Sequence, residues 1–275
     1  MLSLSVHDVV KEYPGGNRAV DGVSFEITPG EATILLGSNG SGKTTLLKCI
    51  NGLNVATSGS IYVGDVDVAE ARRQNAKSSL KKVRRQIGMV FQQFHLIENL
   101  GVLQNVLFGA WGRNRNPWKM FSPFANDRDR YKAMECLDRV GLSEFAARRA
   151  RDLSGGQQQR VAIARMLMQD PEIVLADEPI ASLDPKSGRE VMDLLWEIAD
   201  ERQLTVICAL HQLEIAKEYG NRLIGLKFGK LILDGSAKQI SDAELQQLYE
   251  DVSPDHSHNN SFERTQQQKQ EVTTR

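Results

Sequence analysis

Hydrophobic residues in the first quarter of the chain alternate with polar residues or form short β-branched runs. The pattern is clear at Leu4–Val10, Val23–Ile27 and Gly59–Val63, with glycine-containing turns between these segments. A period of two is typical of half-buried strands, so we predict a β-rich N-terminal region. A further apolar run, Ala32–Leu36, leads into a glycine-rich turn and then into Leu46–Ile50, which has helical character. A strand, a loop and a helix are therefore predicted in succession.

The middle of the chain is predominantly helical in pattern. A charged stretch with helical character, Ala69–Gln86, precedes a short strand signal at Ile87–Phe91. Three further segments have helical spacing: Asn105–Phe108, Arg130–Val140 and Glu144–Arg151. We therefore predict an α-helical subdomain, at approximately residues 93–165, inserted into an α/β core.

Strands and helices alternate again after this insertion. Glu172–Ala176 and Leu204–Leu210 are short apolar runs, and Ser187–Ala199 between them has helical spacing. Alternation of this kind is typical of a parallel sheet with helices on both faces. The sequence thus indicates an α/β fold.

Composition adds limits on size, partners and compartment. The 275 residues, 41% of them hydrophobic, are enough for one substantial core. The formal net charge of −1 gives no basic surface for nucleic acid, which we do not expect as a partner. Cys49, Cys136 and Cys208 are widely spaced among apolar residues, so we predict buried thiols rather than disulfides or a zinc site.

The ends of the chain carry no sign of export or membrane insertion. The first residues lack a signal-peptide pattern, and no apolar run reaches the roughly 18 residues of a membrane span. We expect a cytosolic chain unless another protein recruits it to a membrane. Residues 1–251 form the predicted folded domain, and 252–275, with almost no apolar residues, a disordered tail. His256 and His258 in that tail are interpreted as solvated, not metal-binding.

The glycine-rich turn after Ala32–Leu36 has the composition of a phosphate-binding loop. Its residues, which match G-x-x-x-x-G-K-[ST], are Gly37, Ser38, Asn39, Gly40, Ser41, Gly42, Lys43, Thr44 and Thr45. Backbone N–H groups of such a turn, at the positive end of a helix, can surround phosphate oxygens. Lys43 adds a charge, and the Thr44 hydroxyl can ligate Mg²⁺. A flexible turn without function is the weaker interpretation.

A second candidate feature is the pair Asp177 and Glu178, directly after an apolar strand. A carboxylate at the carboxyl end of a parallel strand lies where open α/β sheets bind ligands. Asp177 is predicted to hold Mg²⁺, and Glu178 to act as the general base that polarises an attacking water. Taken alone the pair would be read as a charged turn, but the phosphate loop favours the catalytic interpretation.

The third feature is the helix start at Ser154, Gly155, Gly156 and Gln157. Ser154 and Gln157 have the spacing of a capping box, which by itself indicates only a well-capped helix. The two glycines are not needed for a cap, yet they allow the backbone to approach an anion closely. A second phosphate-facing helix end suggests one ATP clamped between two surfaces.

Together these motifs resemble those of the ATP-binding subunits of ABC transporters, and the resemblance extends from Leu2 to Asp251. In this family's terms the matching elements are Walker A (Gly37–Thr45), the Gln loop (Gln92), the signature (Leu153–Gln157), the end of Walker B (Leu175–Glu178), the D-loop (Ser182–Asp184) and the switch histidine (His211). They appear in the family's order.

The resemblance implies a P-loop NTPase core with a parallel sheet, an N-terminal antiparallel β subdomain and an α-helical insertion. It implies a head-to-tail homodimer, in which the signature of one copy faces the nucleotide of the other. Tyr13 would stack on adenine, Gln92 would bind Mg²⁺ and sense the membrane partner, and His211 would contact the γ-phosphate and orient water with Glu178. Alone, Tyr13 would be read as surface packing and His211 as a strand-end histidine.

Within the family, four stretches look most like the phosphonate importer ATPase: Asn105–Arg113, Leu153–Arg165, Ala176–Pro185 and Leu210–Gln212. This resemblance implies a peripheral subunit on the cytoplasmic face of the membrane. Its partners would be two integral-membrane permease subunits and, indirectly, an extracytoplasmic substrate-binding protein for phosphonate or a related phosphorus oxyanion. The alternatives are an importer for another substrate and a soluble ABC ATPase in a cytosolic complex, such as a phosphonate-degrading assembly.

The aromatic segment from Trp111 through Trp118 and Phe121 to Phe124 has two open interpretations. Exposed rings would make good anchors for a membrane subunit. Rings packed inside the helical subdomain would fit the same sequence equally well.

Overall fold

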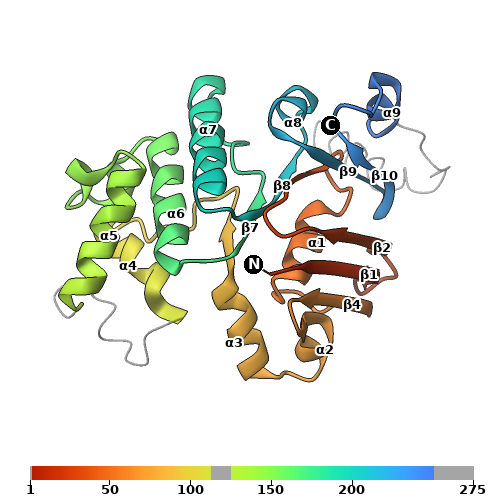
Figure 1. Ribbon diagram of the computed structural model, residues 1–275, viewed down its shortest axis with the longest axis horizontal. Coiled ribbons are helices and arrows are strands. Elements are labelled where there is room, and N and C mark those ends of the chain that lie inside the picture. Colours follow the sequence, from red (N-terminus) through yellow and green to blue (C-terminus); the bar gives the residue numbers. More distant parts are fainter. Residues whose placement is uncertain (1, 113–124, 251–275) are drawn as a thin grey trace, which may run out of the picture.

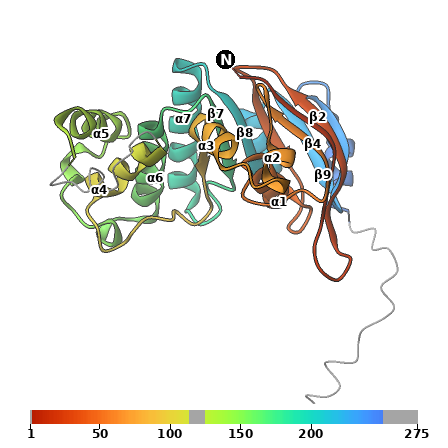
Figure 2. The ribbon, with the colours of Figure 1, turned by 90° about the horizontal axis from the view of Figure 1, so that it is seen from below.

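The computed structural model describes residues 2–112 and 125–250 (Figures 1 and 2). Its strands are β1 (Leu4–Glu12), β2 (Arg18–Ile27), β3 (Ala32–Leu36), β4 (Ser58–Val63), β5 (Val66–Asp67), β6 (Ile87–Val90), β7 (Ile173–Asp177), β8 (Thr205–Leu210), β9 (Arg222–Lys227) and β10 (Lys230–Ser236). Its α-helices are α1 (Lys43–Ile50), α2 (Val68–Arg73), α3 (Lys77–Gln86), α4 (Val102–Leu107), α5 (Asp127–Arg139), α6 (Gly155–Gln169), α7 (Pro185–Glu201), α8 (Leu213–Tyr219) and α9 (Asp242–Gln247). The expected tail at 252–275, with His256 and His258, lies outside the described residues, as do Trp118, Phe121 and Phe124.

The strands form two sheets. The larger sheet has the order β10-β9-β3-β8-β7-β6, in which β9, β3, β8, β7 and β6 are parallel and β10 is an antiparallel edge strand. The smaller sheet has the order β2-β1-β4-β5 and is antiparallel. The prediction of an α/β fold with a β-rich N-terminal region is thereby confirmed.

The central strands are buried on both faces, which explains why they read as continuous apolar runs. In β3, Ile34 and Leu36 belong to a core shared with the helical half of the molecule. Leu35 points to the other face and joins the core formed with α1 and the antiparallel sheet. The second face of the parallel sheet is therefore covered by a sheet as well as by helices, a layer that strand–helix alternation alone does not predict.

The helical half contains α4, α5 and α6, which pack on one another (Figure 1). The predicted helix at Glu144–Arg151 is wrong: this stretch contains only two 3₁₀ turns, Ser143–Phe145 and Ala150–Asp152. The backbone between them accepts hydrogen bonds instead. The carbonyls of Arg148 and Ala146 receive the N–H groups of Val102 and Leu103 at 2.8 and 3.0 Å. The segment thus satisfies the free N–H groups in the first turn of α4, which a helix could not do.

The charged stretch of helical character at Ala69–Gln86 forms two helices, α2 and α3. Asn75 lies between them with φ 53°, a left-handed conformation that ends α2. In α3, Arg84 donates to the carbonyls of Asn51 and Gly52 at 3.4 and 2.7 Å and so ties this helix to the end of α1.

The three cysteines are free and buried, as predicted. Burial raises the pKa of the Cys49 thiol to about 11, so it behaves as an apolar packing group. None of the helices within residues 2–112 and 125–250 has the length and apolar character needed to cross a bilayer.

Candidate functional site

Three neighbouring parallel strands carry the candidate site at their carboxyl ends. β8 lies between β3 and β7, with Leu36 paired to Leu210 and Asp177 paired to Ala209. Because the strands are parallel and in register, the loops that follow them emerge at one edge of the sheet. The phosphate loop, the Asp177-Glu178 pair and His211 are therefore brought together from positions far apart in the sequence, at the ends of strands that lie side by side in Figure 1.

The phosphate loop requires glycine at specific positions. Gly42, immediately before α1, has φ 105°, and a Cβ there would lie 2.1 Å from the carbonyl oxygen of Ala19. Gly40 has φ 83° and faces open space, with nothing within 4 Å of its would-be Cβ. Gly42 is needed for close packing against the antiparallel sheet. Gly40 leaves the backbone accessible to a ligand.

Lys43 is held inside the loop that it follows. Its ammonium donates to the carbonyls of Gly37 and Ser38 at 2.8 and 3.1 Å, and its side chain is only 4% exposed. The Nζ atom also lies 3.4 Å from Oε1 of Glu178. These contacts fix the charge at the mouth of the phosphate loop, next to the carboxylate that follows β7.

Thr44 and Asp177 form a direct contact between Walker A and Walker B. The Thr44 hydroxyl donates to Oδ1 of Asp177 at 2.7 Å. Burial raises the pKa of Asp177, while the Thr44 hydrogen bond opposes this rise. A hydroxyl and a carboxylate side by side are hard oxygen ligands that suit Mg²⁺. Among the described residues no three His, Cys, Asp or Glu side chains gather to hold a metal.

Glu178 has a strained backbone and a well-defined side chain. Its φ is 48°, and its N–H donates to the carbonyl of Ala209 at 3.1 Å. A non-glycine residue in this region is uncommon and costs on the order of 1–3 kcal/mol, a cost often found at functional sites. Oε2 of Glu178 lies 3.2 Å from Nδ1 of His211. The turn after β7 thus points the carboxylate between Lys43 and His211.

The signature residues lie at the start of α6, away from the cluster of Lys43, Glu178 and His211. Ser154 caps α6: its side chain accepts from the N–H of Gln157 at 3.3 Å, and the Gln157 side chain accepts from the N–H of Ser154 at 3.0 Å. Figures 1 and 2 both show α6 separated from α1 by α7 and β7. Gly155 and Gly156 instead face the D-loop and α7, where their would-be Cβ atoms lie 3.2 Å from Leu183 and from Ser187.

Tyr13 and Gln92 lie at the ends of strands from different sheets. Tyr13 follows β1; it is 38% exposed, its hydroxyl accepts from Asn54 at 3.1 Å, and Lys11 Nζ is 4.9 Å from its ring centroid. Gln92 is exposed and comes two positions after β6 ends. Because β6 pairs with β7, Gln92 leaves the sheet at the same edge as Asp177.

Two residues that the sequence reasoning did not single out also bridge these motifs. Gln159, fully buried in α6, donates to the carbonyl of Pro179 at 2.7 Å and so links the signature helix to the turn after Walker B. The repeated glutamines at 157–159 gave no sign of which one turns inward. Tyr249 donates to the carbonyl of His211 at 3.0 Å. An isolated tyrosine before a polar tail offers no sequence signal for such a contact.

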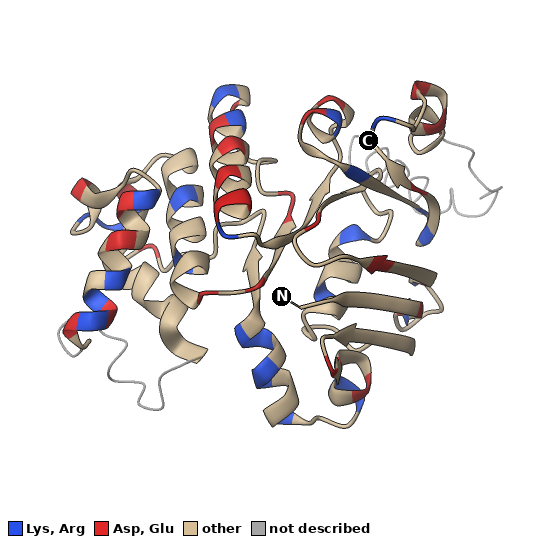
Figure 3. Ribbon diagram, in the orientation of Figure 1, with Lys and Arg blue, Asp and Glu red and all other residues tan. Residues whose placement is uncertain are grey.

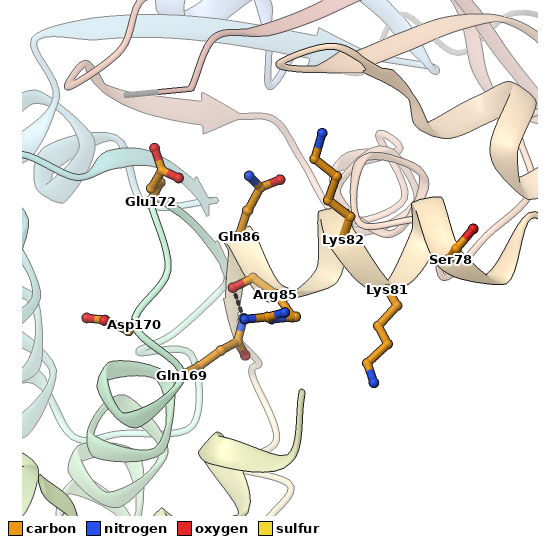
Figure 4. Close-up of a pocket in the computed structure, with 8 residues that line it drawn as sticks. All are labelled: Ser78, Lys81, Lys82, Arg85, Gln86, Gln169, Asp170 and Glu172. Atoms are coloured by element: carbon orange, nitrogen blue, oxygen red, sulfur yellow. Dashed lines mark hydrogen bonds between the residues drawn. The ribbon is translucent and has the colours of Figure 1, made fainter. Parts of the chain in front are cut away.

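Two surface cavities lie near α3, along which basic positions recur (Figure 3). One, of about 560 Å³, is bounded by Lys81 and Arg85 on one side and Asp170 and Glu172 on the other (Figure 4). Its residues precede β6 and β7, so it opens at the edge opposite Asp177. The other, a groove of about 420 Å³, has apolar walls that include Leu53, Met89, Phe91 and Phe108. This groove borders the segment that contains Gln92.

Sequence comparison places the chain in a known family. The family described as ABC transporter matches residues 20–181. A Phosphonates import ATP-binding protein of Frankia casuarinae is 48% identical over 87% of this chain and 92% of its own length. A Phosphate-import ATP-binding protein of Mycolicibacterium smegmatis is 46% identical over 90% of this chain and 92% of its own length.

Solved structures with the same fold agree. A dimeric ATP-binding cassette in a post-hydrolysis state, bound to ADP and Pi, has a TM-score of 0.74 at 35% identity, covering 86% of this chain and all of its own. The ADP conformation of another ABC transporter cassette has a TM-score of 0.75 at 28% identity, covering 90% of this chain and 98% of its own. The chain therefore belongs to the ABC transporter family, as an ATP-binding and ATP-hydrolysing protein.

Proposed function

We propose that this chain is the ATPase subunit of an importer for phosphonate or a related phosphorus oxyanion, acting on the cytoplasmic face of the membrane. The observation that carries the ATPase mechanism is the convergence of Lys43, Glu178 and His211, with contacts of 3.4 and 3.2 Å on the two oxygens of one carboxylate. The transport role and the substrate class are supported by the relatives' names.

ATP would bind with its β- and γ-phosphates against the loop from Gly37 to Thr45. The amides around Gly40 and the ammonium of Lys43 would neutralise phosphate charge, and the exposed ring of Tyr13 would stack on adenine. Thr44 and Asp177, with Gln92 from the neighbouring strand end, would hold Mg²⁺, which when bound offsets charge on the phosphate oxygens.

Hydrolysis would use Glu178 as the general base. Its carboxylate would accept a proton from the attacking water as the new phosphorus–oxygen bond forms and the bond to ADP breaks. His211, against the same carboxylate, would contact the γ-phosphate and hold the water in line. Because phosphoryl transfer depends mainly on positioning and charge, these side chains need only be held rigidly.

A second copy of the chain would complete each nucleotide site. The N–H groups of Gly155 and Gly156 open a helix whose start is remote from the phosphate loop of the same copy (Figures 1 and 2). In a head-to-tail homodimer, Ser154, Gly155, Gly156 and Gln157 of one copy would bind the γ-phosphate held by the other. A solved relative with the same fold is dimeric.

The groove beside Gln92 is the proposed docking site for the permease. Arg165 holds one rim of it, donating to the carbonyls of Phe94 and His95 at 3.0 and 2.6 Å, and burial lowers the pKa of this guanidinium. Trp111, 55% exposed, is available as an anchor near the helical half. A permease helix pressing on the groove would therefore also press on the segment that carries Gln92.

The experiment that tests this function is purification of the native complex in detergent. Recovery of two membrane subunits is expected, and the reconstituted complex with its extracytoplasmic binding protein should hydrolyse ATP faster with methylphosphonate outside. Stimulation by inorganic phosphate alone would assign the chain to phosphate import. Recovery of only soluble enzymes would overturn the transport role and support a cytosolic assembly. The Glu178→Gln variant is the matched control, because it should assemble normally without turnover.

A further inference from the structure

The last described segment of the chain is anchored to the α/β core. Leu245 and Leu248 are each 1% exposed, and a Cβ on Gly225 of β9 would lie 2.7 Å from Leu248. Lys227 Nζ donates to the carbonyl of Glu250 at 2.8 Å. Tyr249 lies between Leu248 and Glu250, so the chain is fixed against the sheet on both sides of this residue.

Tyr249 reaches from this segment into the candidate ATPase site. Its hydroxyl donates to the backbone carbonyl of His211 at 3.0 Å. Burial raises the pKa of the phenol to about 12, opposed by a hydrogen bond from the Gly37 backbone and assisted by the charge of Glu178. The phenol thus stays protonated at neutral pH, and it lies close to the first residue of the phosphate loop and to the catalytic carboxylate.

The loop that carries His211 needs an anchor of this kind. His211 stands between β8, which ends at Leu210, and α8, whose N-cap Gln212 makes no side-chain capping bond. The same loop borders a cavity of about 510 Å³, lined also by Leu183, Asp184 and Tyr249. Beside this open space, the hydrogen bond from Tyr249 restrains the backbone at His211.

We propose that Tyr249 is a positioning residue for ATP hydrolysis: it fixes the backbone of His211 so that the imidazole stays against Glu178. The C-terminal segment at 241–250 thereby contributes to turnover, although it supplies no group that touches ATP. This inference rests on the proposed ATPase mechanism. Its test therefore includes the Glu178→Gln variant, whose loss of turnover establishes independently that the measured activity comes from this site.

The test compares Tyr249→Phe with Tyr219→Phe in the full chain. Tyr219, a partly buried residue at the end of α8, likewise donates one side-chain hydrogen bond, to Asp193, and Trp196 packs against its ring. We expect Tyr249→Phe to lower kcat about 5–10-fold with KM and ATP affinity unchanged within twofold, and Tyr219→Phe to leave kcat unchanged. Wild-type kcat for Tyr249→Phe would overturn the proposal.

A double-mutant cycle and a spectroscopic signal separate positioning from general stability. In a His211→Gln background, Tyr249→Phe should cause no further loss of kcat, because the group it positions is gone. The imidazole resonance of His211, identified by its absence in His211→Gln, should shift in Tyr249→Phe and not in Tyr219→Phe. An equal loss of kcat in both backgrounds, or an unshifted His211 resonance, would show that Tyr249 only stabilises the fold.

Discussion

Glu178 and His211 face each other across two adjacent strands, with Oε2 of the carboxylate 3.2 Å from Nδ1 of the imidazole. The pair exists because β7 and β8 are parallel neighbours whose ends differ by a single residue, with Asp177 paired to Ala209. Each residue occupies the first position after its strand, so the sheet itself sets the distance between them. The remaining carboxylate oxygen is directed at Lys43, which joins the phosphate loop to the same cluster.

Replacing Glu178 with Gln should abolish turnover while ATP binding persists. The amide keeps the size and hydrogen-bonding reach of the side chain but cannot accept the proton of the attacking water, so we expect kcat to fall by roughly 10²–10⁴-fold. ATP hydrolysis and equilibrium binding of a fluorescent ATP analogue measure the two effects separately. Glu26→Gln, on an exposed position of β2, is the matched control and should behave as wild type. Wild-type turnover by Glu178→Gln would remove this residue from its assigned role.

Replacing Asp177 with Asn should stabilise the nucleotide-free protein and reduce its stabilisation by Mg·ATP. The pKa of Asp177 is raised by burial, so the unfolded chain loses this proton first as the pH increases. The contribution of Asp177 to the free energy of unfolding therefore decreases as the pH rises from about 4 to the raised pKa of the folded state. Above that pKa the contribution stays constant. At pH 7 we expect Asp177→Asn to be more stable by about 1 kcal/mol, with the difference shrinking toward pH 4.

Urea unfolding at several pH values measures this effect. Asp65→Asn is the control, because the contact with Lys82 lowers the pKa of Asp65. The charged form of Asp65 therefore stabilises the folded protein, whereas the charged form of Asp177 destabilises it. A gain in stability for Asp65→Asn at pH 7 equal to that for Asp177→Asn would contradict the explanation by burial. In Mg·ATP, Asp177→Asn should gain less thermal stability than the wild type.

Replacing Ser154 with Ala should weaken both the cap of α6 and the dimer. Loss of the capping hydrogen bond costs about 1 kcal/mol of folding stability. Asn126→Ala removes the comparable cap of α5, where the Asn126 side chain accepts from the N–H of Asp129 at 2.7 Å. Light scattering of the Glu178→Gln protein with Mg·ATP should show that only Ser154→Ala reduces dimer formation. Equal dimer loss in both variants would mean that helix stability, and not nucleotide contact, explains the effect.

Replacing Trp111 and Trp118 with Ala should weaken assembly with the membrane subunits more than nucleotide binding. Trp111 is 55% exposed, with its ring centroid 6.2 Å from that of Phe108, so its removal alone should change stability by no more than about 0.5 kcal/mol. Co-purification with the permease measures the interaction. Tyr131→Ala, 69% exposed on α5, is the control for loss of a surface ring. Unchanged co-purification of the tryptophan variant would refute an anchoring role.

The sequence by itself determined the elements that depend on local pattern. The period-two strands, the apolar runs before Gly37 and Asp177, and the phosphate loop are all set by neighbouring residues, because local sterics and burial fix them. The signature cap at Ser154 is equally local, since its two hydrogen bonds span only three residues. These features were sufficient to indicate the fold class and the family.

Tertiary structure alone decided how distant residues meet. The order of β3, β8 and β7 brings Lys43, Glu178 and His211 together, and no local pattern encodes which strands become neighbours. The segment expected as a helix at Glu144–Arg151 is nearly non-helical because its carbonyls bond to the start of α4. Tyr249 reaches His211 across 38 positions of sequence for the same reason: packing of the whole core, not spacing along the chain, sets long-range contacts.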